Sequence, residues 1–216
     1  MCGNDKTKNC SGLRNFWRLL EKIEPLLPAP KAKKKSGRPR KGDRKIMSGI
    51  FYLLFTGCQW KALPRFYGAP STVHDLFQEW QRSCLFESMW LAGLVEYDFE
   101  KGLEWEWQSI DGSMTKAPLG GAGTEANPTD RGKKGTKRIV LTDGKGIPLS
   151  VVVDGTNSHD KKLVKRTLDA IFFERSSPED IIQNICMDKG YDFTDIRKLV
   201  EDYGYIRISK VVEKKT

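Results

Sequence analysis

Two short segments of the chain each place an aspartate directly after an apolar stretch and close before a glycine. The first is Ser109-Ile110-Asp111-Gly112-Ser113, and the second is Ile185-Cys186-Met187-Asp188-Lys189-Gly190. Mg²⁺ prefers oxygen ligands, and two carboxylates delivered by strand ends to one edge of a sheet can hold divalent metal for phosphoryl transfer. A single Asp-Gly pair is more typical of a turn. The prediction of a metal site at Asp111 and Asp188 therefore depends on the elements that carry them.

The elements expected after residue 105 bring the two aspartates together. Apolar and β-branched runs predict strands over 107–111, 138–142, 147–154, 184–188 and 205–209, and helical spacing predicts helices over 160–174 and 193–201. Asp143-Gly144 predicts a hairpin between the second and third strands. The order β-β-β-α-β-α-β matches the ribonuclease H-like layout, in which the first and fourth strands are neighbours. Asp111 and Asp188 are then expected side by side.

The first hundred residues predict a helical domain behind a basic arm. Apolar residues at helical spacing predict helices over 12–24, 43–57 and 71–84, with Asp43 and Ser71 as N-caps and Gly57 as a stop. Between Lys31 and Lys45 nine residues are basic and one is acidic, whereas the net charge of the 216-residue chain is +9. Helices joined by a compact turn behind a basic arm favour a DNA-binding module, and an ordinary helical subdomain is the alternative.

The basic balance of the chain favours a polyanionic partner, most simply nucleic acid. Gly37-Arg38-Pro39-Arg40 resembles the core of an AT-hook, and non-specific phosphate binding by the arm is the simpler alternative. The glycine-rich segment 127–135 is either a phosphate-contacting loop near Asp111 or a solvated hairpin loop. The expected DNA contacts are the basic residues of these two regions: Lys33, Lys34, Lys35, Arg38, Arg40, Lys41, Arg44, Arg131, Lys133 and Lys134.

Other chemistries lack the residues that they need. The chain has two histidines and five cysteines with no CxxC spacing, which argues against a zinc site. It carries no P-loop, dinucleotide-binding or GxSxG motif, so no nucleotide cofactor and no serine nucleophile are expected. No stretch approaches the ~18 apolar residues that span a membrane, and no signal peptide is recognised. We therefore expect a cytoplasmic protein without a membrane partner.

Several passages together resemble the bacterial insertion-sequence DDE transposases of the group named after insertion sequence 5. In chain order they are Gly37-Arg38-Pro39-Arg40, Gly57-Cys58-Gln59-Trp60, Ser71-Thr72-Val73-His74, Ile110-Asp111-Gly112-Ser113, Asn127-Pro128-Thr129-Asp130-Arg131-Gly132-Lys133, Asn157-Ser158-His159-Asp160 and Asp188-Lys189-Gly190-Tyr191-Asp192. The resemblance runs from about residue 37 to the C-terminus. Asn157 or Ser158 can equally be the N-cap of the helix expected after it.

The resemblance implies an α+β chain with two domains. Residues 1–100 would form a helical DNA-binding domain with its basic arm at 31–45, and residues 101–216 a ribonuclease H-like catalytic domain with a mixed sheet. Asp111 and Asp188 would be the first two acids of the DDE triad, with Mg²⁺ or Mn²⁺ as cofactor. The implied partners are the terminal inverted repeats of the element and its target DNA, and a homo-oligomer on that DNA is compatible with the resemblance.

The C-terminus departs from the family pattern. The catalytic glutamate of the family lies in an Arg-x-x-x-Glu context, on a helix well beyond the strand that follows the second aspartate. Glu213 is the acidic residue that follows the last expected strand, and its neighbours do not match that context. We interpret Glu213 as a tail residue and the catalytic domain as incomplete at its C-terminus. The expected function is DNA transposition by metal-dependent strand cleavage and transfer; the alternatives are an inactive DNA-binding remnant or regulator and, less favoured, a stand-alone nuclease.

Overall fold

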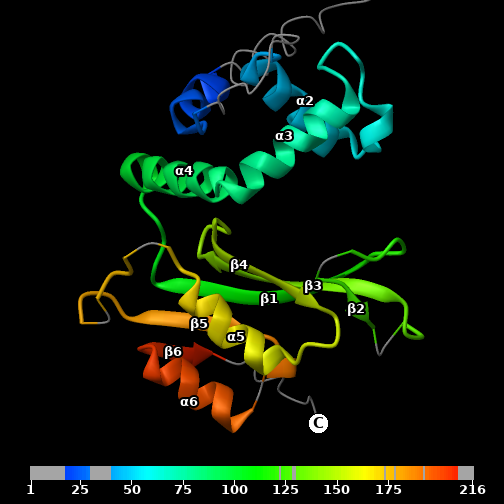
Figure 1. The fold of residues 1–216 in the computed structure, drawn as a ribbon. Helices are drawn as coiled ribbons and strands as arrows, with labels where there is room; N and C mark the ends of the chain where they lie inside the picture. Colours follow the sequence, from blue (N-terminus) through cyan, green and yellow to red (C-terminus); the bar gives the residue numbers. More distant parts are fainter. Residues whose placement is uncertain are drawn as a thin grey trace, which may run out of the picture. The chain divides into compact units, whose positions relative to one another are not determined.

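The computed structural model describes residues 18–29, 40–121, 123–127, 130–172, 174–177, 179–191 and 193–208. The chain forms two compact units, residues 1–93 and 94–216, and the division falls inside helix α4 (Leu85–Lys101). The first unit is helical and the second is built around a mixed sheet, which confirms the predicted α+β class (Figure 1). None of the helices in the described ranges is long and apolar enough to cross a membrane.

The helical unit is built on α2 (Asp43–Thr56) and α3 (Pro70–Arg82), with residues 18–23 also helical. Two short 3-10 turns, η1 (Glu24–Leu26) and η2 (Trp60–Ala62), connect these elements. The helices bury one apolar stripe each, as amphipathic helices do. Their buried residues form one core together with Leu63 after η2 and Leu85 at the start of α4; the core residues are Leu20, Ile23, Ile46, Met47, Ile50, Leu63, Val73, Leu76, Trp80 and Leu85.

The helix stop was predicted correctly, but both predicted N-caps are wrong. Gly57 ends α2 in the left-handed conformation, with φ of 65°, which glycine adopts at little cost. The N-cap of α2 is Gly42, and Asp43 lies in the first turn. In α3, Pro70 occupies the first turn, where its fixed φ suits the helix and its missing N–H costs no hydrogen bond, so Ser71 already lies inside.

The second unit holds a six-stranded sheet. Its strands are β1 (Trp107–Lys116), β2 (Glu125–Ala126), β3 (Lys134–Asp143), β4 (Pro148–Gly155), β5 (Gln183–Met187) and β6 (Tyr205–Ile208). Strand β1 lies between β3, which is antiparallel to it, and β5, which is parallel to it. Strand β4 pairs with the far side of β3, and β6 with the far side of β5. The predicted neighbour relation of the ribonuclease H-like layout is therefore confirmed, whereas the short β2 was not predicted.

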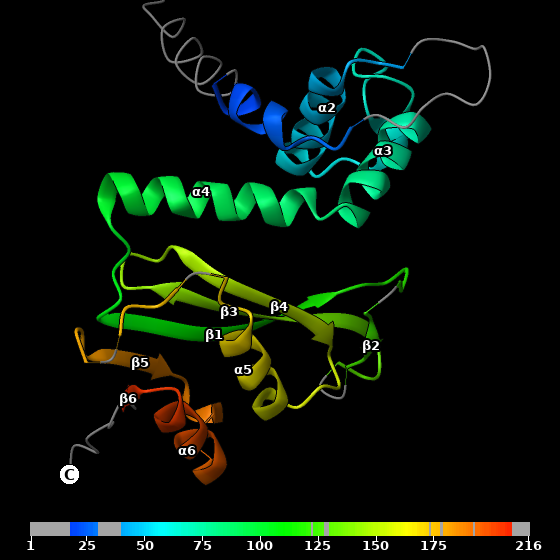
Figure 2. The same cartoon turned by 60° about the vertical axis from the view of Figure 1, so that its left-hand side comes forward.

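Helix α5 (Asp160–Asp169) packs against β3 and β4, and α6 (Thr194–Asp202) packs against β6 (Figure 2). A 3-10 turn, η3 (Lys189–Tyr191), follows β5. The helix predicted over 160–174 ends early, at Asp169. The chain then brings Arg175 to the first residue of β5, where its guanidinium donates a hydrogen bond to Gln183 Oε1 at 2.8 Å. The guanidinium also donates a hydrogen bond to the Tyr203 carbonyl oxygen at 3.0 Å. Tertiary contacts of this kind can override a local helical pattern.

The core of the sheet unit lies on one face of the sheet. Side chains alternate between the two faces of a strand, and Ile110, Ile139, Leu141 and Ile185 are almost fully buried on the face that α5 covers. Asp111 lies between Ile110 and Gly112 and therefore belongs to the opposite face. The sheet thus separates a packed face from a face that carries the acidic residue.

Candidate active site

The parallel pairing of β1 with β5 brings Asp111 and Asp188 to adjacent positions. The register pairs Ile110 with Met187, and the next residues along the two strands are the two aspartates. Both aspartates are exposed, whereas Ile110 and Met187 are buried. Side chains alternate between the two faces of a strand. When this alternation is extended by one residue beyond β5, both carboxylates lie on the face opposite α5. Two apolar strands thus deliver two charged groups to one exposed surface.

The prediction that each aspartate ends its strand is right for Asp188 and wrong for Asp111. Strand β1 continues to Lys116, and Asp111 lies opposite Val140 in its antiparallel ladder with β3. What ends at this level is the parallel ladder between β1 and β5. Asp111 is therefore held within a continuous pair of strands, and Asp188 follows directly on the end of the adjacent strand.

The Asp111 side chain bonds to the backbone beside it. The N–H of Gly112 donates a hydrogen bond to Asp111 Oδ1 at 2.8 Å. This bond leaves the second carboxylate oxygen available to a cation or to water. Ser109, Ser113 and Thr115 occupy the same face of β1 at alternate positions, so the surface around Asp111 is polar.

Arg138 is a basic neighbour that sequence reasoning missed. It lies on β3 opposite Ser113, on the same face as Asp111, and it is exposed. Its guanidinium donates a hydrogen bond to Thr115 Oγ1 at 3.1 Å. The sequence did carry a signal for it. Arg138 begins the expected strand 138–142 and alternates with Ile139 and Leu141, and this alternation predicts that it lies on the opposite face from these buried residues.

The loop after Asp188 is short and anchored. The Tyr191 N–H donates a hydrogen bond to the Asp188 carbonyl oxygen at 3.0 Å, and the Tyr191 side chain is 5% exposed. The His159 ring lies 5.7 Å from the Phe193 ring, measured between centroids. The sequence alone allowed two roles for Asn157-Ser158-His159-Asp160, as a helix N-cap or in catalysis. In the structure this segment lies beside the loop that follows the second aspartate.

Asp154 is a charged group of the second unit with a structural role. Its carboxylate accepts a hydrogen bond from the Gly155 N–H at 2.8 Å and forms an ion pair with Arg166 of α5. The Gly155 hydrogen bond has the largest effect and lowers the pKa of Asp154. Burial opposes it, and the hydrogen bond and charge of Arg166 and the hydrogen bond with Ser158 lower the pKa further. The pair links α5 to β4.

The other end of β1 and β5 is closed by a buried polar network. Gln108 Nε2 donates a hydrogen bond to Gln183 Oε1 at 3.2 Å, and the Tyr205 hydroxyl donates one to Gln108 Oε1 at 2.8 Å. The Arg175 guanidinium donates to the same Gln183 oxygen and lies 4.0 Å from the centre of the Tyr205 ring. Burial raises the pKa of Tyr205 to about 12.

The glycine-rich segment between β2 and β3 forms a tight loop. The Asn127 N–H donates to the Lys133 carbonyl oxygen at 2.9 Å, and Arg131 adopts a left-handed conformation with φ of 53°. Arg131, Lys133 and Lys134 are exposed. Both interpretations of this segment, as a phosphate-contacting loop or as a solvated loop, are compatible with this geometry.

The basic arm is described only in part. Lys33, Lys34, Lys35 and Arg38 lie outside the described residues, as does Glu213 at the C-terminal end. Arg40 forms an ion pair with Asp43 at 2.9 Å, and Lys41 is half-buried.

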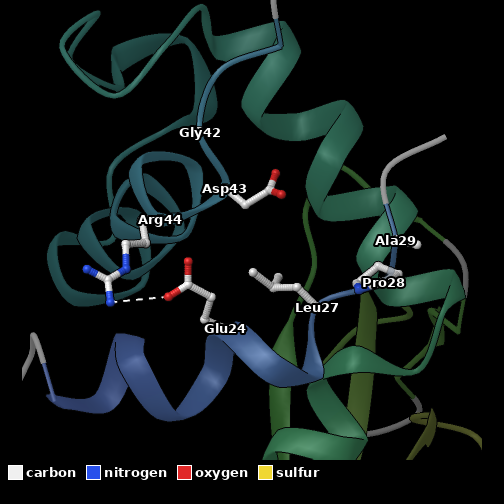
Figure 3. Close-up of a pocket in the computed structure, with 7 residues that line it drawn as sticks. All are labelled: Glu24, Leu27, Pro28, Ala29, Gly42, Asp43 and Arg44. Carbon is white, nitrogen blue, oxygen red and sulfur yellow. Dashed lines mark ion pairs between the residues drawn. The ribbon is translucent and has the colours of Figure 1, made fainter. Parts of the chain in front are cut away.

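Arg44 pairs with Glu24 at 3.2 Å and with Glu21 at 3.9 Å. Figure 3 shows Arg44 turned toward Glu24 at a pocket of about 380 Å³, which is lined by η1 and the residues after it and by the start of α2. Arg40 and Arg44, two of the expected DNA contacts, are thus engaged by carboxylates of the helical unit itself.

The aspartate pair suits a hard divalent cation. Mg²⁺ is usually bound through one or two carboxylates together with waters and substrate phosphates. Two exposed carboxylates on one surface offer this donor set, and a bound cation offsets their mutual repulsion. In the described ranges, no group of three or more His, Cys, Asp or Glu side chains is arranged to hold a metal ion.

Two family descriptions cover most of the chain. The family described as "Putative transposase of IS4/5 family" matches residues 17–90, and "Transposase DDE domain" matches residues 108–216. The chain belongs to the DDE transposase family. The range matched by the DDE domain includes Asp111 and Asp188, and the range matched by the N-terminal family includes α2 and α3. The resemblance inferred from the sequence passages is therefore confirmed.

Two curated relatives of this DDE transposase come from Burkholderia cepacia. "Putative transposase for insertion sequence element IS402" is 33% identical over 84 residues, which are 38% of this chain and 40% of the relative. "Insertion element IS402 uncharacterized 16.2 kDa protein" is 30% identical over 111 residues, which are 50% of this chain and 74% of the relative. The match thus spans less than half the length of the first relative.

Solved structures of other transposases resemble the chain at low scores. The piggyBac transposase synaptic complex with hairpin DNA has a TM-score of 0.41 at 14% identity, covering 88% of this chain and 45% of that one. The Mos1 strand transfer complex has a TM-score of 0.34 at 14% identity, covering 82% and 61%. TM-scores this low carry no argument about the fold. The fold of this chain is defined by its own strand order.

Proposed function

We propose that this DDE transposase takes part in DNA transposition, binding the ends of an insertion element and cleaving and transferring DNA strands at a divalent-cation site formed by Asp111 and Asp188. The observation that carries the proposal is the β1–β5 register, which ends one residue before both aspartates. Membership of the DDE family supports the same reaction class.

The chain's own contribution is to hold oxygen ligands in a fixed arrangement. A divalent cation, Mg²⁺ or Mn²⁺, when bound supplies Lewis-acid polarisation of a phosphoryl oxygen and activation of the attacking oxygen. Asp111 is held in the continuous β1–β3 pair, and Asp188 directly follows β5. This backbone support fixes both carboxylates on elements that move little, which a metal site of defined geometry needs.

The DNA backbone would be neutralised by Arg138, by basic residues at the start of β3 and by the arm. Arg138 shares the face of Asp111. Arg131 and Lys133 are exposed in the loop before β3, and Lys134 is exposed at its first residue. Phosphate contacts of this kind position a duplex without reading its sequence. Because Arg40 and Arg44 are already paired with carboxylates, the arm's contribution would come chiefly from Lys33, Lys34, Lys35, Arg38 and Lys41.

The proposal is tested with the full chain and a labelled duplex that carries a terminal inverted repeat of the element. Cleavage is measured with Mg²⁺ and with Mn²⁺, beside a duplex whose end sequence is scrambled. Asp111→Asn and Asp188→Asn are expected to abolish cleavage while retaining DNA binding. Asp202→Asn, at the exposed end of α6, removes the same charge elsewhere in the unit and is expected to cleave normally.

Each other outcome rejects one part of the proposal. Cleavage that survives either site substitution would show that the aspartates are not the metal ligands. DNA binding without cleavage in both metals would favour the alternative of an inactive DNA-binding remnant or regulator. Equal cleavage of the scrambled duplex would favour a stand-alone nuclease.

A further inference from the structure

We propose that Tyr191 is a positioning residue, which sets the spacing of the two carboxylates by seating its hydroxyl against β1 at Gly112. The inference rests on the proposed metal site and names what holds its geometry. It starts from the end of the β1–β5 ladder, where the last paired residues are Ile110 and Met187. The aspartates stand one residue beyond that pair, so another contact must fix the distance between the strands at their level.

Gly112 provides the seat on β1. It directly follows Asp111 and faces the packed side of the sheet, opposite Ile139 of β3. A Cβ atom added at Gly112 would lie 2.7 Å from the Tyr191 hydroxyl oxygen, which is closer than real Cβ contacts come. The next atom, Ile139 Cγ1, lies at 3.7 Å, an ordinary contact. The tyrosine hydroxyl is therefore the single close neighbour that requires glycine at this position.

Tyr191 connects this seat to Asp188. Its N–H donates a hydrogen bond to the Asp188 carbonyl oxygen at 3.0 Å, and its own carbonyl oxygen accepts one from the Phe193 N–H at 2.9 Å. Its side chain is buried, whereas the Asp188 side chain is exposed. The η3 turn thus sends Asp188 to one face and Tyr191 to the other, with only two residues between them.

The two contacts bracket the aspartates. On one side lies the last ladder pair, and on the other lies the Tyr191 hydroxyl against Gly112. Because proteins pack closely and resist compression, a bulkier residue at 112 would push Tyr191 away, and the η3 turn would carry Asp188 with it. If Tyr191 only filled space in the core, its ring would suffice, and its hydroxyl would not need to fit against a glycine.

The experiment measures Mn²⁺ binding by electron paramagnetic resonance, together with thermal unfolding, on the full chain. Gly112→Ala is expected to weaken Mn²⁺ binding roughly 10-fold or more, as loss of outer-shell support commonly does. Tyr191→Phe in the same chain removes the clashing oxygen, so the double variant Gly112→Ala/Tyr191→Phe should bind within about threefold of Tyr191→Phe alone. Gly190→Ala is the matched control, because a Cβ there meets no atom within 4 Å.

The rescue separates positioning from general destabilisation. A double variant that binds as weakly as Gly112→Ala, or a Gly112→Ala protein with unchanged Mn²⁺ binding, would overturn the proposal. Should Gly112→Ala fail to fold, Tyr191→Leu gives the second measure, and a folded Tyr191→Leu protein with unchanged Mn²⁺ binding would also overturn it. Unmodified protein that does not bind Mn²⁺ would instead reject the proposed metal site, whereas rescue of thermal stability in the double variant would still support the hydroxyl seat.

Discussion

The two ends of the β1–β5 pair are built in opposite ways. At one end Gln108, Gln183 and Tyr205 are buried, and Gln108 is hydrogen-bonded to both of the others. At the other end the ladder stops, and Asp111 and Asp188 stand exposed beyond it. Buried polar networks with every group satisfied make a structure rigid and specific. The closed end thus anchors the two strands, and the open end carries two like charges on an exposed surface.

The largest effect is expected when the closed end is opened. Gln183→Ala removes the oxygen that accepts from both Gln108 and Arg175 and leaves a buried amide donor and a half-buried guanidinium without that partner. We expect a loss of about 3 kcal/mol in the free energy of unfolding, since unsatisfied buried and charged donors are costly. Urea denaturation measures this loss, and Mn²⁺ affinity of the folded protein should not change.

Asn184→Ala is the control for that experiment. Asn184 is adjacent on β5 but only half-buried, with its amide donating to the Glu106 carbonyl oxygen at 3.1 Å. Its loss should cost less than about 1 kcal/mol. Equal destabilisation by the two substitutions would mean that the closed end is not the special anchor of the strand pair.

The open end should show the reverse behaviour. At a Mn²⁺ concentration of about 100 times its dissociation constant, bound metal stabilises a folded protein by about 2.7 kcal/mol. Asp111→Asn and Asp188→Asn should abolish this stabilisation. Asp111→Asn should also leave the metal-free stability unchanged or slightly higher, because one of two repelling charges is removed. Thermal unfolding with and without Mn²⁺ measures both quantities. A large loss of metal-free stability in Asp111→Asn would break the comparison.

Sequence periodicity predicted the strands that carry the site because their buried faces are apolar. Ile110, Ile139, Leu141 and Ile185 alternate with exposed residues, and the strand order then required β1 and β5 to be neighbours. The same reasoning missed the continuation of β1 beyond Asp111. Gly112 and the polar residues after it weaken the strand pattern, while pairing with β3 holds them in place.

The closed end could not be read from the sequence. Gln108, Gln183 and Tyr205 lie far apart along the chain, and a glutamine in a strand looks like a solvent-facing residue. Only the fold shows that they share one buried contact. Arg138 was missed for a related reason. It matters because it lies on the same face of the sheet as Asp111 and close to it in the strand register, and a count of charges in the segment does not reveal this.

An alkaline titration should next report on the closed end alone. Burial raises the pKa of Tyr205 from 10.0 to about 12. The folded state then holds the phenol proton more tightly than the unfolded state, so the contribution is complete below pH 10 and is lost as pH rises toward 12. We expect a loss of roughly 2 to 3 kcal/mol over this range.

Denaturation curves for the unmodified protein and Tyr205→Phe isolate that contribution. Every other titratable group is present in both proteins, so its effect cancels in the comparison. The difference in unfolding free energy between the two proteins should therefore shrink from pH 9 to pH 12. A constant difference would show that Tyr205 is not held neutral by its burial.

The smallest effect concerns how the open end meets DNA. Arg138 lies on the Asp111 face and is hydrogen-bonded to Thr115, so Arg138→Gln should remove one phosphate contact. We expect DNA affinity to fall roughly 3- to 10-fold, and the slope of log affinity against log salt to become shallower by about one. Lys198→Gln, an exposed residue of α6, makes the same change in net charge and should barely alter the slope. If both variants change affinity and slope equally, the DNA responds to the overall charge of the unit and not to the face that carries the aspartates.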